Sequence, residues 1–223
     1  MKHSLIDILI RPDVFFQDVS GERENFKFPG LIVMILAIIG AVTAYFISSP
    51  IAQMMDGIQS GLGALTIVGA SIVSFIGAFV FWILWTGVFY LVSSLFKGSG
   101  TFKKSLEFIG YGYLPQIFGA ILTVIVAIQF LPSVVVRQIS ASAVQENPQL
   151  IQEAVNNLMH DPAMMEMTQI TAIISIVFLL WSAQIWISGM KNARHLSVRD
   201  SALCVGIPVV AYILYIIYTM TGI

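Results

Sequence analysis

Five long apolar runs dominate the pattern of hydrophobic and polar positions along the chain. They cover roughly residues 29–49, 67–96, 106–131, 168–189 and 202–221. Each can cross the hydrocarbon core of a bilayer, which is about 30 Å thick and takes about 20 helical residues to span. The pattern therefore predicts an all-α polytopic membrane protein, in which residues 29–223 form a five-transmembrane-helix bundle.

Residues 1–28 form a separate segment ahead of the first run. An apolar stretch over residues 5–10 is broken at Arg11-Pro12, and Phe15 and Phe16 then start a second apolar patch. Such a pattern is typical of an amphipathic helix lying in the headgroup region of a membrane. We interpret the segment as cytoplasmic and interfacial, with Phe15 and Phe16 as the candidate interfacial anchor. A helix packed under the bundle through protein contacts alone is the alternative.

Residues 132–167 are the one sizeable hydrophilic piece between runs. Asn147-Pro148 opens an amphipathic pattern that continues to Met159. Asp161-Pro162 resembles an N-cap followed by proline at the first helical position of the fourth span. We expect an external helical loop, with a connecting loop of no further role as the alternative.

The third run follows a short glycine-containing turn and is itself interrupted by glycines and a proline. Thr101 is a plausible N-cap for the helix that begins after the turn. Proline removes a backbone donor, so this helix is expected to be kinked or locally open. Gln116 could hydrogen-bond a carbonyl that the proline frees. The candidate hinge consists of Gly110, Gly112, Pro115 and Gln116; the alternative is an ordinary membrane helix that happens to contain these residues.

Composition and charge refine this assignment. Apolar residues make up 57% and charged residues 10% of the chain, whereas about a quarter of an average soluble domain is charged. The net charge of −1 argues against a nucleic-acid-binding protein, which normally presents a basic face. Cys204 is the single cysteine, so the chain cannot contain an intrachain disulfide framework.

The distribution of cations predicts the orientation in the membrane. Of the eleven lysines and arginines, ten lie before the first span, between spans two and three, or between spans four and five; only Arg137 lies in the other connections. By the positive-inside rule the N-terminus is cytoplasmic and the C-terminus is outside. The candidate lipid-headgroup contacts are Lys97, Lys103, Lys104, Lys191, Arg194 and Arg199, because each cation near an anionic surface contributes about 1 kcal/mol.

The chain lacks the side chains that membrane-embedded chemistry requires. No Asp, Glu, Lys, Arg or His lies deep within a span, which counts against a proton-coupled transporter or an intramembrane protease. The three histidines fall on both sides of the predicted membrane and cannot share one metal ion. No phosphate-loop, metalloprotease or nucleophile-elbow motif is present. We therefore expect no enzymatic activity, no cofactor and no metal site.

The order of several short motifs resembles the Ypt-interacting protein (Yip) domain family of five-span membrane proteins. The motifs are Pro12 with Phe15-Phe16, FKGSGTFKKSL in the loop before the third span, GYGYLP at residues 110–115 and GMKNARHLSVRDSAL before the fifth span. In eukaryotes this family is associated with secretory membranes, Rab-type GTPases and membrane shaping. The resemblance thus implies a trafficking-like or membrane-organising role.

Two departures from the eukaryotic pattern limit what the resemblance implies. The cytoplasmic N-terminal region is much shorter here, and the family's aspartate-leucine-tyrosine-glycine-proline motif is replaced by FKFPGL at residues 26–31. We therefore do not expect binding of a Rab-type GTPase. The compact form resembles archaeal or bacterial members, which implies the cell membrane of a prokaryote.

The expected function is a non-enzymatic scaffold that binds membrane lipids and either protein partners or other copies of itself within the bilayer. The alternative is a channel or facilitator for a small solute. Its path would have to use the deepest polar groups, which are the amides of Gln116, Gln129 and Gln184.

Overall fold

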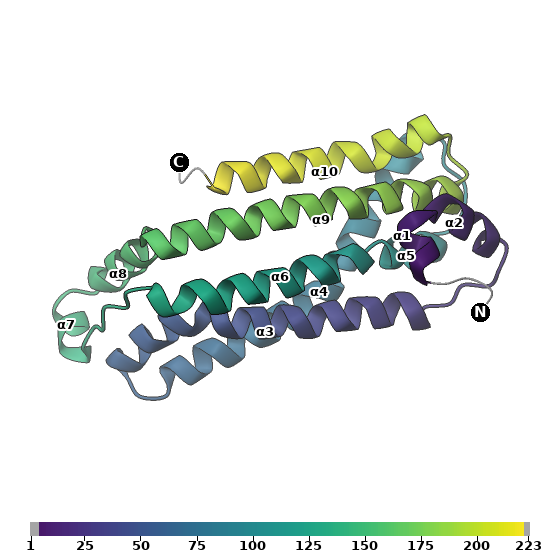
Figure 1. Ribbon diagram of the computed structural model, residues 1–223. Helices are drawn as coiled ribbons and strands as arrows, with labels where there is room; N and C mark the ends of the chain where they lie inside the picture. Colours follow the sequence, from purple (N-terminus) through teal and green to yellow (C-terminus); the bar gives the residue numbers. More distant parts are fainter. Residues whose placement is uncertain (1–4, 221–223) are drawn as a thin grey trace. The chain divides into compact units, whose positions relative to one another are not determined.

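The computed structural model describes residues 5–220, and in that range it contains helices and connecting segments but no strand (Figure 1). The elements are α1 (Leu5–Ile10), α2 (Pro12–Ser20), α3 (Lys27–Ile58), α4 (Leu62–Leu95), α5 (Phe102–Tyr111), α6 (Leu114–Phe130), the 3-10 helix η1 (Leu131–Ser133), α7 (Ala141–Glu146), α8 (Gln149–Met159), α9 (Pro162–Arg194) and α10 (Val198–Met220). The predicted all-α class is therefore confirmed.

Five of these helices are long and apolar enough to cross a membrane: α3, α4, α6 with η1, α9 and α10. Large apolar side chains are exposed along them, including Leu65, Ile72 and Val73 on α4. Such surfaces suit contact with the hydrocarbon core of a bilayer, which is itself apolar. The five-span architecture predicted from the sequence is confirmed.

The first two spans are longer than the apolar pattern indicated. Helix α3 continues through Pro50 to Ile58, and α4 already begins at Leu62. The turn between them is closed by Asp56, whose carboxylate accepts hydrogen bonds from the backbone N–H groups of Gly61 (3.0 Å) and Gly63 (2.8 Å). Gly61 adopts φ of +91°, which a residue with a side chain rarely tolerates.

The third predicted span consists of two helices. Helix α5 ends at Tyr111, Gly112 and Tyr113 form a turn, and α6 starts at Leu114. The predicted break is thus present. Pro115 lies in the first turn of α6, where the missing N–H would have no partner within the helix.

Two compact units make up the chain. The first contains Met1–Leu36, Gly77–Gly119 and Ser175–Ile223. Its hydrophobic core includes Phe16, Phe89, Phe108 and Trp186, all at most 1% exposed. Within this unit α1, α2 and α5 gather where α3 begins and α9 ends (Figure 1), and seven of the ten residues of α5 are buried.

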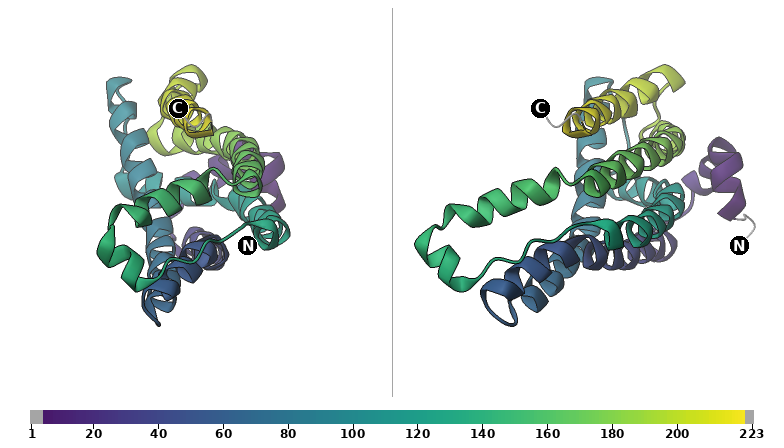
Figure 2. Two further views of the ribbon diagram at one scale, coloured as in Figure 1. Left: turned by 90° about the vertical axis from the view of Figure 1, so that its left-hand side faces the viewer. Right: turned by 60° about the vertical axis from the view of Figure 1, so that its left-hand side comes forward.

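The second unit contains Ala37–Ile76 and Ala120–Ile174 and has a smaller core that includes Leu158, Met164 and Met167. Its α7 and α8 form a helical hairpin (Figure 2), so the predicted helical loop is present. Asp161 caps α9 as expected, because its carboxylate accepts hydrogen bonds from the N–H groups of Ala163 (2.9 Å) and Met164 (3.3 Å).

Candidate functional site

Helix α5 is a short amphipathic helix held inside the first unit at both ends. Thr101 caps its start as predicted, accepting a hydrogen bond from the backbone N–H of Lys104 (3.1 Å). Near its other end, the indole N–H groups of Trp82 and Trp186 donate to the carbonyls of Leu106 and Ile109, each at 2.9 Å. Ile109 lies in the last turn of α5, where carbonyls lack helical partners, so Trp186 helps to fix where α5 ends, whereas Trp82 bonds a carbonyl about one turn earlier.

The same tryptophans explain the glycines that follow. A Cβ at Gly110 would lie 2.6 Å from Pro29 and 2.9 Å from Trp82, and one at Gly112 would overlap the Trp186 ring. Gly112 has φ of −68°, so no left-handed conformation requires glycine there. The contacts indicate that Gly110 and Gly112 allow close packing of the two indole rings, which favours a fixed break over a mobile hinge.

Gln116 makes a different contact from the one expected. Its amide donates to the Ser182 hydroxyl of α9 at 3.2 Å and does not reach a carbonyl freed by Pro115. The physical reason is the position of Pro115 in the first turn of α6, where it frees no carbonyl of that helix. Gln116 therefore links α6 to α9.

Phe15 and Phe16 are buried, which corrects their assignment as an interfacial anchor. They are 6% and 0% exposed. The Phe16 ring lies 4.6 Å from the Phe108 ring, and the Phe15 ring lies 5.2 Å from that of Tyr111. Stacking against α5 buries these rings more completely than a headgroup layer would. The alternative of packing through protein contacts accounts for them.

The opposite face of the N-terminal helices carries the exposed apolar residues. Ile6, Ile10 and Val14 are 60%, 70% and 54% exposed. Ile6 and Ile10 are four residues apart and share one face of α1, and Val14 is in the first turn of α2. This group, called the apolar stripe and defined by Ile6, Ile10 and Val14, is exposed at the surface of the N-terminal helices.

The six cations proposed as headgroup contacts divide into two groups. Lys97, Lys103 and Arg199 are exposed, whereas Lys104, Lys191 and Arg194 are engaged inside the protein. The sequence placed all six near the membrane surface but could not separate the two groups, because the separation depends on long-range partners.

Lys104 fastens the segment before α3 onto α5. Its ammonium donates to the carbonyls of Val19 (3.0 Å) and Glu22 (3.1 Å) and lies 3.1 Å from the carboxylate of Glu107. Burial raises the pKa of Glu107, and the nearby Lys104 only partly opposes this effect. Ionisation of Glu107 therefore lowers stability as the pH rises from the ordinary pKa of 4.5 toward the raised one.

Arg194 is the most deeply engaged of the three, at 3% exposed. Its guanidinium donates to the Ser93 hydroxyl (2.8 Å), to the carbonyl of Gly98 (2.6 Å) and to that of Gly100, and it lies 4.1 Å from the Tyr90 ring centre. In the part of the chain that the structure covers, no carboxylate pairs with it. Its charge is stabilised by oxygen dipoles and an aromatic face.

The turn around Arg194 is closed from both sides. The backbone N–H of Ser99 donates to the carbonyl of Arg194 at 2.9 Å. Gly100 adopts φ of +108°, and a Cβ there would overlap the carbonyl oxygen of Ala193. Glycine is therefore required at Gly100 both by its backbone conformation and by this close approach. The GSG sequence at residues 98–100 thus packs against the end of α9. These contacts join the connection between α4 and α5 to the connection between α9 and α10, which is far away in sequence.

Lys191 anchors α2. Its ammonium lies 2.8 Å from both carboxylate oxygens of Asp13, which also accepts from the amide of Asn192 at 3.1 Å. The hydrogen bond from Lys191 is the main reason that the pKa of Asp13 is lowered. The stabilisation from this pair is complete above the ordinary pKa of 3.8 and is lost as the pH falls through the lowered value.

We expect the charge of Lys191 to control how closely the N-terminal helices are docked. Leu9 packs against the core. The rate at which a thiol reagent labels Leu9→Cys, in a Cys204→Ser background, therefore reports how often the N-terminal helices separate from the core. Lys191→Asp should speed labelling about fivefold, since a partly exposed pair contributes up to about 1 kcal/mol. Adding Asp13→Lys should restore slow labelling. Equally fast labelling in the double variant would contradict the pairing.

Two of the three amides proposed for a solute path, Gln116 and Gln184, do not face one another. Gln184 is exposed on α9, whereas Gln116 bonds Ser182, which is fully buried. Two residues apart on a helix correspond to about 200° of rotation, so Gln184 points away from the face of α9 that Gln116 contacts. The arrangement gives no support to a shared polar path.

Among residues 5–220, no three His, Cys, Asp or Glu side chains cluster closely enough to hold a metal ion. Cys204 is buried, with its thiol 3.0 Å from the carbonyl of Phe89. In the first unit Lys104, Lys191 and Arg194 join separate segments of the chain, which indicates a structural use of these charges.

Sequence reasoning missed three residues that organise the site: Ser93, Tyr90 and Trp186. The one available signal was chemical, because a tryptophan or arginine in an apolar run needs a hydrogen-bond partner. The glycine pairs at 98 and 100 and at 110 and 112 marked the places where such a side chain could approach the backbone.

Comparison with known proteins agrees with these motifs. The Yip1 domain family matches residues 6–220. An uncharacterized protein of the archaeon Methanocaldococcus jannaschii is 41% identical over 124 residues, which are 56% of this chain and 88% of that protein. No solved structure matches the chain significantly. The resemblance read from the order of the motifs is confirmed, and the archaeal relative is consistent with a prokaryotic-type member.

Proposed function

The chain belongs to the Yip1 domain family, and on that premise we propose that this integral membrane protein is a non-enzymatic scaffold that organises lipids at one membrane surface. The proposal concerns the first unit, in which α5 and the motifs around it are packed together. It extends to protein partners or further copies of the chain only through the surface that this packing leaves exposed.

The observation that carries the proposal is the division between engaged and exposed groups in the first unit. The ionisable side chains Lys104, Glu107 and Arg194 are buried and form hydrogen bonds or ion pairs within the protein. The exposed groups include the apolar stripe and the cations Lys97, Lys103 and Arg199, as well as the carboxylates of Asp18, Glu22 and Glu24. Exposed apolar side chains and exposed lysine and arginine within one unit are the combination that binds an anionic membrane surface.

Chain connectivity supports a lipid contact for the apolar stripe. Helix α2 ends at Ser20 and the first span begins at Lys27, so only six residues separate them. Asp13 in α2 is also bonded to Lys191 and Asn192 near the end of the span α9. Both links hold the stripe near the membrane surface. With the positive-inside rule, they support a cytoplasmic position for this surface and for the N-terminus.

The proposal can be tested with an environment-sensitive fluorophore on the full chain in liposomes of phosphatidylcholine and phosphatidylglycerol. In a Cys204→Ser background, a dye on Ile10→Cys should emit as in an apolar medium and be quenched by nitroxide-labelled lipids. The matched control is Gln17→Cys, an exposed position at the polar end of the same helical pair, where emission should be close to that in water.

The comparison between the two positions decides the outcome. Stronger quenching by lipid at position 10 than at position 17 supports a stripe that enters the headgroup layer. Equal emission and equal quenching at the two positions would contradict the proposed lipid contact, whether both dyes report an aqueous or an apolar environment.

A further inference from the structure

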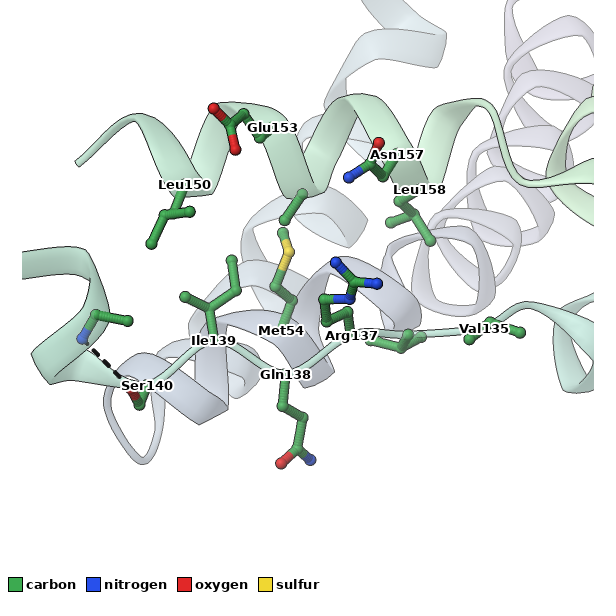
Figure 3. A pocket seen from close by; sticks show the side chains of 13 residues that line it. Met54, Val135, Arg137, Gln138, Ile139, Ser140, Leu150, Glu153, Asn157 and Leu158 are labelled. Carbon is green, nitrogen blue, oxygen red and sulfur yellow. Dashed lines mark hydrogen bonds between the residues drawn. The ribbon is translucent and has the colours of Figure 1, made fainter. Parts of the chain in front are cut away.

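The second unit contains a cavity of ≈ 600 Å³ between α8 and the extended segment that follows η1 (Figure 3). Met54 of α3 contributes to its wall, and α7 closes one end through Ala143. Gly57 lets the extended segment approach α3, because a Cβ there would lie 2.8 Å from the carbonyl oxygen of Ile139. The volume of the cavity falls within the range of about 300–1,000 Å³ typical of small-molecule sites.

The cavity lining combines a group of buried apolar side chains with polar ones. Met54, Ile139 and Leu158 are 2%, 8% and 5% exposed and form the buried apolar part of its wall, and Leu150 lies at the α7 end (Figure 3). This apolar part of the wall suits a hydrocarbon group, since burial of apolar surface is the main driving force available there.

The other end of the cavity carries a single cation. Figure 3 shows the Arg137 side chain directed toward α8, near Asn157 and Leu158, while Glu153 points away from the extended segment. Arg137 forms neither a hydrogen bond nor an ion pair with any described residue, and it is exposed. A guanidinium in this position can bind a carboxylate or phosphate through two parallel hydrogen bonds.

The cavity also lies at the ends of membrane spans. Met54 is four residues before the end of α3, and Leu158 is four residues before the start of α9. Val135, which lines the cavity, is 77% exposed. Lipids of the adjoining leaflet are therefore the amphiphiles within reach of the opening.

We propose that this cavity binds one hydrocarbon chain of an anionic lipid, with the headgroup at Arg137 and Asn157 and the chain along Met54, Ile139 and Leu158. The site holds a single lipid molecule in a defined place. None of its residues belongs to the exposed surface of the first unit, so the inference does not depend on the proposed scaffold function.

Native mass spectrometry of the purified full chain in a non-ionic detergent provides the test. The probes are lysophosphatidylglycerol and lysophosphatidylcholine with the same acyl chain. The wild-type chain should retain one molecule of the anionic probe in preference to the zwitterionic one. Arg137→Gln should weaken binding of the anionic probe about tenfold and leave the zwitterionic probe unchanged. Arg199→Gln, which removes an exposed cation elsewhere, should leave both unchanged.

Filling the cavity separates a lipid slot from a cationic surface patch. Ala154→Trp on α8 and Ala143→Phe on α7 each place a large ring in the cavity and should abolish retention of both probes. The thermal transition of each variant shows whether it has folded, and one folded variant of the two is sufficient. Retention of the anionic probe in a folded, filled variant would overturn the proposal, as would an equal loss in Arg137→Gln and Arg199→Gln.

Discussion

Arg194→Ala is expected to destabilise the protein more than replacement of any other cation in the chain. It removes the hydrogen bonds to Ser93, Gly98 and Gly100 and leaves these three oxygens without the guanidinium donor. Charge-assisted hydrogen bonds contribute about 1.5–3 kcal/mol each. We expect a loss of about 3 kcal/mol, or roughly 6–12 °C in melting temperature.

The single cysteine offers a convenient measurement. Cys204 is buried, so a thiol-reactive dye reports unfolding of the unmodified chain during heating. Tryptophan fluorescence should give the same transition and guards against a local change around Cys204. Arg194→Lys should recover only part of the loss, because an ammonium cannot bond three divergent oxygens in the manner of a guanidinium.

Arg199→Ala is the matched control for Arg194→Ala, since Arg199 is an exposed cation at the start of α10. Its melting temperature should stay within about 2 °C of the wild type, as expected for a surface substitution of about 0.5 kcal/mol or less. If Arg194→Ala shifted the transition as little as this control, the bonds around Arg194 would not stabilise the fold.

Gly112→Ala is the second substitution expected to have a large effect. The added methyl group would overlap the Trp186 ring. That ring is 1% exposed, lies 5.8 Å from the Trp85 ring and 5.3 Å from the Tyr113 ring, and donates to Ile109. Overpacking a rigid core costs about 1–3 kcal/mol, and displacing the indole adds the loss of its hydrogen bond. We expect a total of about 3 kcal/mol.

Gly87→Ala provides the control for this prediction. Gly87 lies within α4, and a Cβ there would meet nothing within 4 Å. Alanine is the better helix former by about 1 kcal/mol, so the melting temperature should stay the same or rise slightly. Equal melting of Gly112→Ala and wild type would mean that Trp186 can move aside, and the break before α6 would then be adaptable.

Both substitutions act on contacts that position the exposed cations. Arg194 holds the turn that contains Lys97, and the tryptophans fix α5, which carries Lys103. The surface proposed to meet lipid therefore depends on a rigid interior. Partial loss of that interior is expected to weaken lipid organisation without removing any exposed charge.

The sequence by itself determined the features that depend on near neighbours along the chain. Five spans follow from the length and apolarity of five segments. Thr101 and Asp161 cap helices because each needs only the backbone N–H groups two or three residues ahead. The break before α6 follows from glycines and a proline within a few residues.

Only the tertiary structure decided how side chains are used once the helices meet. Phe15 and Phe16 were expected at lipid and instead pack on α5. Lys104 and Arg194 were grouped with exposed cations but bond partners 82 to 101 residues away. An apolar ring or a cation satisfies the same local pattern whether lipid, water or protein surrounds it. Which of these surrounds it is determined by the residues that folding brings alongside, and a pattern of neighbouring residues contains no information about them.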